Sequence, residues 1–134
     1  MSCTTIEVTD LRFTYPGAHE SVLDGLSVSI GEGERVALLG PNGSGKTTFV
    51  LHLNGLLSLQ SGTIRIGDLD MTDANLPEIR RRVGAVFQDA DDQLFMQSVR
   101  DDVSFGPANL GVPRGDLDGV VERALDQVGA MPLK

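Results

Sequence analysis

The sequence is poor in cysteine and in long apolar runs, and each scarcity excludes a class of protein. The single cysteine, Cys3, lies in a polar N-terminal stretch, so we expect an exposed thiol and neither an internal disulfide nor a cysteine metal cluster. Apolar runs such as residues 36–39 fall far short of the ~20 residues that span a bilayer. The chain also opens without the basic and then apolar pattern of a signal peptide. We therefore expect a cytoplasmic protein that reaches a membrane only through a partner.

Positive charge is also scarce. The 134 residues include 11 lysines and arginines against 19 aspartates and glutamates, which gives a formal net charge of -8. This balance argues against nonspecific attraction to nucleic acid or to an anionic lipid surface. Any phosphate group must instead be held locally, by donors aimed at it. The length and the 40% hydrophobic content predict one soluble globular domain with a real core.

Two kinds of strand are predicted. Residues 6–8, 11–15, 26–30 and 63–66 alternate apolar and polar side chains, as half-buried strands do, and turns separate them. We expect these segments to form an antiparallel sheet. Residues 35–39 and 83–87 are instead apolar on both faces, which is typical of strands buried inside a parallel sheet.

Four segments are expected to be helices, three of them from the spacing of their apolar residues. They are residues 46–57, the short polar segment 77–82, residues 99–105 and residues 117–128, the last closed by Gly129. Breaks are expected at Gly106-Pro107 and at Gly111-Val-Pro113. The three adjacent arginines at 80–82 are most simply interpreted as a solvated face.

A phosphate-binding loop is the strongest signal in the chain. Residues 40–47 read Gly-Pro-Asn-Gly-Ser-Gly-Lys-Thr and match the pattern G-x-x-x-x-G-K-[ST], with a predicted buried strand before them and a helix after them. Glycines at 40, 43 and 45 are expected to take positive φ, so that successive N–H groups converge on one point at a helix N-terminus. The alternative is a glycine-rich turn that carries a surface lysine.

Each polar side chain of this loop has an expected partner. The β-phosphate is expected inside the ring of N–H groups, and Lys46 is expected to reach the β and γ oxygens. The hydroxyl of Thr47 is a predicted ligand of Mg²⁺, and Thr48 is expected to reach the α-phosphate.

A family resemblance follows from two further motifs. The run from Gly40 to Thr48 followed by Val-Phe-Gln88 resembles the ATP-binding subunits of ABC transporters, over essentially every residue. More narrowly, residues 87–95 and 102–107 resemble the ATPases of energy-coupling-factor importers and of the related cobalt and nickel uptake systems. The implied fold is the N-terminal part of an α/β P-loop ATPase core. It comprises an antiparallel β subdomain, parallel strands with the phosphate-loop helix, and the start of a helical subdomain, with the sheet incomplete.

The resemblance also implies roles for single residues. Tyr15 falls where the family places an aromatic ring that stacks on adenine, although a tyrosine at the end of a strand is more often an edge residue. Gln88 falls where a glutamine joins the shell of Mg²⁺ and the attacking water; the alternative is a polar strand end. The residues predicted to bind nucleotide are Tyr15, Gly40, Asn42, Gly43, Ser44, Gly45, Lys46, Thr47 and Thr48. Lys46 and Gln88 are the predicted catalytic residues, and Thr47 and Gln88 the predicted metal ligands.

Partners follow from the same resemblance. The segment 88–96 is expected to face a transmembrane transporter subunit, and Asp91, Asp92 and Gln93 are the residues to test, although a solvated acidic loop explains them equally well. A second ATPase subunit is expected in the complete form, and no nucleic acid is expected. The resemblance divides the chain into residues 1–95 and the start of a helical subdomain at 96–134. His19 and His52 match no catalytic position and receive no role.

Several family motifs do not occur in these 134 residues. There is no Leu-Ser-Gly-Gly-Gln signature, no second strand that ends in Asp-Glu, and no switch histidine. General-base assistance is typically worth ~10²–10⁴ in rate, so we expect nucleotide binding with hydrolysis close to background. An isolated chain is expected to expose apolar sheet, and so to show marginal stability, self-association or dependence on the rest of the protein.

Three functions remain as hypotheses. The first is part of an importer ATPase that binds Mg-ATP to energise uptake of a metal ion or a vitamin, at the cytoplasmic face of the membrane. The second is a noncatalytic nucleotide-binding or interaction module. The third is an ordinary P-loop kinase or GTPase, which leaves Tyr15 and the segment 88–95 unexplained.

Overall fold

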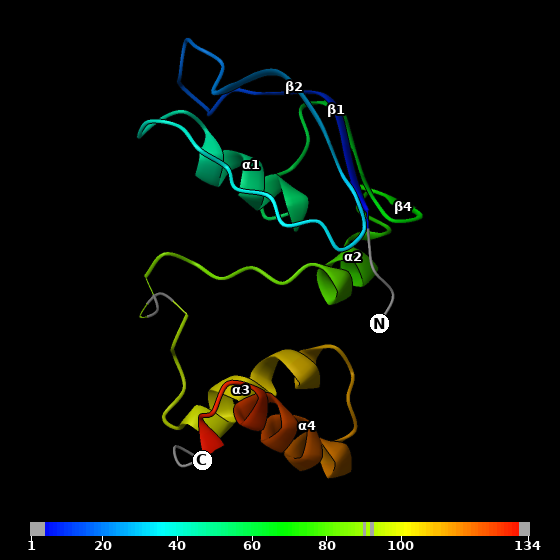
Figure 1. Ribbon diagram of the computed structural model, residues 1–134, viewed down its shortest axis with the longest axis vertical. Helices are drawn as coiled ribbons and strands as arrows, with labels where there is room; N and C mark the ends of the chain where they lie inside the picture. Colours follow the sequence, from blue (N-terminus) through cyan, green and yellow to red (C-terminus); the bar gives the residue numbers. More distant parts are fainter. Residues whose placement is uncertain (1–4, 90, 92, 132–134) are drawn as a thin grey trace. The chain divides into compact units, whose positions relative to one another are not determined.

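The computed structural model describes residues 5–89, 91 and 93–131 (Figure 1). The chain forms two compact units, residues 1–85 and residues 86–134. Cys3 and Asp92, for which the sequence predicts an exposed thiol and a partner contact, lie outside the described residues. The functional division after residue 95 rests on the family resemblance and stays a prediction.

A four-stranded antiparallel sheet is the framework of the first unit. Its strands are β1 (Ile6–Phe13), β2 (Leu23–Ile30), β3 (Ser61–Ile66) and β4 (Leu69–Asp70), in the order β2-β1-β3-β4. Ile6 pairs with Ile30 of β2 on one side and with Ile66 of β3 on the other. The alternating segments of the sequence therefore form the antiparallel sheet that they predict, with residues 6–13 in one strand.

An irregularity in β1 explains why the sequence divides this strand into two runs. Val8, Leu11 and Phe13 are all buried, but the step from Val8 to Leu11 breaks the period of two. The register with β3 shifts between Thr9 and Arg12, and Asp10 there has a φ of 48°. The extra residue of this bulge returns Leu11 to the buried face.

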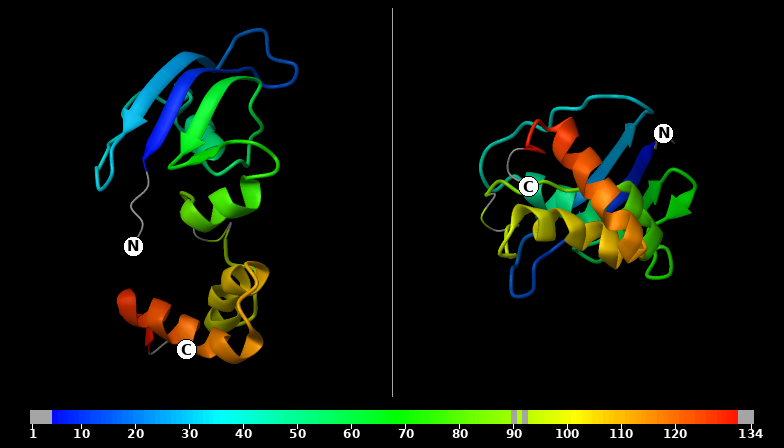
Figure 2. Two further views of the ribbon diagram at one scale, coloured as in Figure 1. Left: turned by 90° about the vertical axis from the view of Figure 1, so that its right-hand side faces the viewer. Right: turned by 90° about the horizontal axis from the view of Figure 1, so that it is seen from below.

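One face of the sheet carries the core of this unit. Helices α1 (Lys46–Leu53) and α2 (Leu76–Arg82) cover it, and α1 lies behind the strands in the left view of Figure 2. Phe49 of α1 and Ile79 of α2 join side chains from the strands in one buried cluster. The complete buried cluster is Val8, Leu11, Phe13, Leu23, Phe49, Ile64, Ile66 and Ile79. This packing holds the helix that follows the phosphate loop against the sheet.

The expectation of two parallel strands is wrong for this structure. The sheet includes neither residues 35–39 nor residues 83–87. Leu39 is 88% exposed and Val86 is 92% exposed. A strand inside a parallel sheet needs hydrogen-bonded neighbours along both edges and cover on both faces. No strand of the described residues pairs with either segment. Most of their apolar side chains are therefore exposed, although Val83 is half-buried against the core.

The second unit is a pair of helices, α3 (Val99–Asn109) and α4 (Arg114–Gln127). Ser98 caps α3, since its Oγ accepts a hydrogen bond from the N–H of Asp101 at 3.2 Å. The expected break at Gly106-Pro107 is wrong, because α3 continues through both residues. Pro107 lies in the last turn, where its missing N–H removes only one helical hydrogen bond, and Leu110 N–H still donates to Gly106 O at 3.0 Å.

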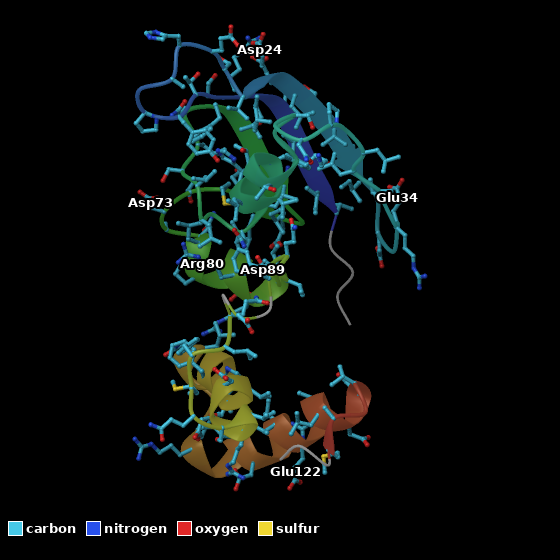
Figure 3. All side chains as sticks on the ribbon, turned by 90° about the vertical axis from the view of Figure 1, so that its left-hand side faces the viewer. Asp24, Glu34, Asp73, Arg80, Asp89 and Glu122 are labelled. Carbon is cyan, nitrogen blue, oxygen red and sulfur yellow. The ribbon has the colours of Figure 1, made fainter. Side chains whose placement is uncertain are left out.

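The three arginines of α2 are all exposed, as the interpretation as a solvated face predicts, and they also have partners on the protein. Arg80, labelled in Figure 3, donates from Nε to Asn54 O at 3.3 Å and from Nη2 to Gly55 O at 3.0 Å. It thereby holds the turn that follows α1. Arg82 forms ion pairs with Asp68 and Glu78, and its hydrogen bond holds the pKa of the Asp68 carboxyl below its ordinary value. This stabilisation is present above the unfolded pKa and is lost only as the pH falls through the lower folded value.

Arg80→Ala is expected to lower the free energy of unfolding by about 1 kcal/mol, because two carbonyls at the end of α1 lose a charged donor. Urea unfolding followed by circular dichroism measures the change. Arg35→Ala is the control, since Arg35 is exposed in the segment 35–39, which forms no strand. Equal shifts of the two midpoints would show that Arg80 contributes only its charge.

Candidate nucleotide-binding site

The loop at residues 40–47 leads directly into α1, as its motif predicts. Gly43 and Gly45 have φ of 84° and 89°, in the left-handed region that favours glycine. Gly40 differs from the expectation, because its φ lies outside that region. A Cβ there would lie 2.7 Å from Ser44 Oγ, so a side chain at position 40 would require the Ser44 hydroxyl to move. Gly40 therefore permits the close approach of Ser44 across the loop.

Gly45 fixes the point at which α1 begins. It is the N-cap residue, and a Cβ there would lie 2.9 Å from Leu23 Cδ2 at the start of β2 and 2.9 Å from Val22 O just before it. No side chain of the described residues caps this helix end. The N–H groups of its first turn thus remain available to an anion, in the positive end of the helix dipole.

Lys46 brings positive charge to the same loop. Its Nζ donates to Gly40 O at 2.7 Å and to Pro41 O at 2.8 Å. The ammonium group therefore lies over the loop, within reach of an anion bound by the N–H groups. The predicted nucleotide residues Asn42 and Ser44 are exposed in this loop, and Thr47 is exposed on the first turn of α1.

Tyr15 and Thr48 are brought together by the fold, although they are 33 residues apart. The Tyr15 hydroxyl and Thr48 Oγ1 are 3.0 Å apart, and Thr48 is buried. The Tyr15 ring packs edge to face on Phe13, with centroids 4.9 Å apart, and remains 39% exposed. An amphipathic ring that is anchored at both ends and open to solvent is suited to stacking on a base. Sequence spacing gives no signal for this hydrogen bond.

Gln88 belongs to the second unit, where it is exposed. The predicted site residues therefore divide between the two units, and the role of Gln88 at the nucleotide stays a prediction. Within the segment 88–96, Gln93 Oε1 accepts from Phe87 N–H at 3.4 Å. Asp102 Oδ1 accepts from Met96 N–H at 3.1 Å, which ties this segment to α3.

His52 is the residue that sequence reasoning missed. It is fully buried between α1 and the sheet, with ring centroids 4.7 Å from Phe13. The only available signal was its helical position, one turn after Thr48 and on the same face as Phe49.

The side chains at the loop meet the requirements of a Mg²⁺ ion that arrives with a nucleotide. No group of three or more His, Cys, Asp or Glu side chains lies close enough to hold a metal ion in the part of the chain that the structure describes. Mg²⁺ usually keeps several waters and takes its remaining ligands from one or two side chains and from phosphates. An exposed Thr47 hydroxyl beside a phosphate-binding loop meets that requirement.

No helix within residues 5–89, 91 and 93–131 is both long enough and apolar enough to cross a membrane.

Comparisons with known proteins identify the family of this chain. The family model described as ABC transporter matches residues 23–134. A protein of Streptomyces coelicolor assigned to the ATP-binding proteins of ABC transporters is 52% identical over 97% of this chain and 50% of its own length. The cobalt import ATP-binding protein of Syntrophus aciditrophicus is 46% identical over 92% of this chain and 45% of its own length.

A solved structure shows the same fold. It is cbiO1 from Clostridium perfringens, described as part of the ABC transporter complex cbiONQ, with a TM-score of 0.78 and 37% identity. The match covers 96% of this chain and 52% of cbiO1, so the chain spans about half the length of the relatives that it matches. The phosphate loop, the family model and these relatives all lead to one conclusion. The chain belongs to the ABC transporter family of ATP-binding proteins.

Proposed function

We propose that the chain binds Mg-ATP through residues 40–48 and Tyr15, as the N-terminal part of the ATP-binding subunit of an ABC importer. The observation that carries this proposal is the uncapped N-terminus of α1, with Gly43 and Gly45 in left-handed conformations and the Lys46 amine over the loop. An acidic chain can hold a polyphosphate there because the donors are aimed at it locally.

Each residue has a role in this proposal. Loop N–H groups hold the β-phosphate, and Lys46 releases its two carbonyl acceptors to reach the β and γ oxygens. The Thr47 hydroxyl is a ligand of Mg²⁺, and Thr48 reaches the α-phosphate. Tyr15 stacks on the adenine. Gln88 would be a further ligand of Mg²⁺ and would orient the attacking water, which is the role that the family resemblance implies for it. Mg²⁺, when bound, neutralises charge on the phosphates.

The proposal extends to the assembled transporter. The segment 88–96, with Asp91 and Gln93, faces a transmembrane subunit, and residues 96–134 begin the helical subdomain. A second ATPase subunit supplies the other half of each nucleotide site, and the protein is peripheral at the cytoplasmic face of the membrane. The cobalt import relative supports a metal ion as the transported solute, with a vitamin as the alternative.

Catalysis is expected to be weak in these 134 residues alone, because they contain no Asp-Glu strand end to position the attacking water. The competing function is a noncatalytic nucleotide-binding or interaction module.

Calorimetric titration of the chain with Mg-ATP, beside an assay of phosphate release, tests the proposal. We expect saturable binding at one site with turnover close to background. Tight binding of Mg-GTP in preference to Mg-ATP would instead favour the kinase or GTPase class. Absence of binding of either nucleotide would overturn the proposal.

A further inference from the structure

His52 is buried in an arrangement that packing alone does not favour. It is fully inaccessible to solvent, and its Nδ1 lies 2.7 Å from Thr48 O. Because a carbonyl can only accept, Nδ1 is the protonated nitrogen. Nε2 is then a buried acceptor, and it has no hydrogen-bond partner among the described residues. A leucine would fill this apolar position without leaving a polar atom unpaired.

The contacts of His52 form a ring of four residues that includes Tyr15, the residue predicted to contact the base. Its ring meets Phe13 edge to face, with centroids 4.7 Å apart. Phe13 meets Tyr15 in the same way at 4.9 Å. The Tyr15 hydroxyl then bonds to Thr48 Oγ1, and the carbonyl of Thr48 bonds back to His52. His52 thus contacts both residues that hold Tyr15, namely Phe13 at its ring and Thr48 at its hydroxyl.

We propose that His52 is a positioning residue that holds the exposed ring of Tyr15 in the orientation for stacking on the base. This inference rests on the proposed function, in which Tyr15 contacts adenine. The base and the phosphates of the nucleotide are held by different groups. His52 affects affinity for the base through Tyr15, whereas the N–H groups of the loop and Lys46 hold the phosphates without it.

Binding of two ligands by the whole chain tests the proposal. One ligand is Mg-ATP and the other is magnesium tripolyphosphate, which has the phosphates but no base. His52→Leu is expected to weaken Mg-ATP binding about 5-fold, and Tyr15→Ala about 10-fold. Tripolyphosphate affinity should fall less in both variants, because Thr48 is the one proposed phosphate contact that bonds to Tyr15 and His52. In the double variant, the loss should equal that of Tyr15→Ala alone, because His52 acts through the tyrosine.

His52→Asn is the conservative variant, since its amide keeps a donor near the position of Nδ1. It should recover part of the affinity that His52→Leu loses. An equal loss for Mg-ATP and tripolyphosphate in His52→Leu, or losses that multiply in the double variant, would overturn the proposal.

Tyr15 also provides a readout that needs no nucleotide. The chain has one tyrosine and no tryptophan, so its intrinsic fluorescence reports Tyr15 alone. Acrylamide quenching should increase in His52→Leu and stay unchanged in Ile79→Val, which trims the same core at α2. Unchanged quenching in His52→Leu contradicts the role of His52, whereas a chain that binds neither ligand contradicts the proposed function.

Discussion

Lys46→Ala is expected to weaken Mg-ATP binding by about 100-fold, which corresponds to roughly 2.7 kcal/mol. The ammonium group of Lys46 already lies over the loop, bonded to the carbonyls of Gly40 and Pro41. Moving it to phosphate oxygens exchanges two neutral acceptors for charged ones, and charge-assisted hydrogen bonds are about twice as strong. In a chain of net charge -8, no bulk positive field compensates for its loss.

Arg114→Ala is the matched control for this prediction. It removes one positive charge from an exposed position at the start of α4, outside the predicted site, so its effect measures net charge alone. Calorimetric titrations of both variants with Mg-ATP at fixed ionic strength measure the difference. If the two variants lost affinity equally, the loop would not be the phosphate site and the proposed function would fail.

The sequence predicts the local features of this fold well, because local chemistry determines them. Alternation identifies the strands of the antiparallel sheet, and the glycine-lysine pattern identifies the start of α1 at Lys46. The prediction fails where a segment depends on neighbours distant in the chain. Residues 35–39 have the composition of a buried strand, but strand formation requires partners at both edges.

The candidate site shows the same division. Residues 40–47 are predictable because their motif is continuous in the chain. Three other features are tertiary contacts that no periodicity in the sequence predicts. They are the hydrogen bond of Tyr15 with Thr48, the bonds of Arg80 to the turn after α1 and the burial of His52. Helix propensity also predicts a break at Pro107 that does not occur, because the last turn of a helix tolerates one missing N–H.

Gly62→Ala is expected to be the most destabilising small substitution in the sheet, by about 3 kcal/mol or more. Gly62 has a φ of 86°, and a Cβ there would lie 2.5 Å from Asp10 O and 2.6 Å from Thr9 O. Both atoms are backbone of the β1 bulge, so relief requires β1 and β3 to separate. A small domain has about 5–15 kcal/mol of total stability, so the variant loses a large share of it.

Gly33→Ala isolates the cause of this loss. Gly33 has a comparable φ of 71°, but a Cβ there meets nothing within 4 Å. The Gly33→Ala variant therefore measures the backbone strain of positive φ alone, which is about 1 kcal/mol. Urea unfolding of both variants, followed by circular dichroism, gives the difference. If Gly62→Ala loses more free energy of unfolding than Gly33→Ala, the difference comes from the contact between β3 and the bulge. Equal losses would show that the bulge moves to accommodate the added methyl group. Because that bulge returns Leu11 to the core on which α1 packs, its rigidity also decides how firmly the phosphate loop is supported.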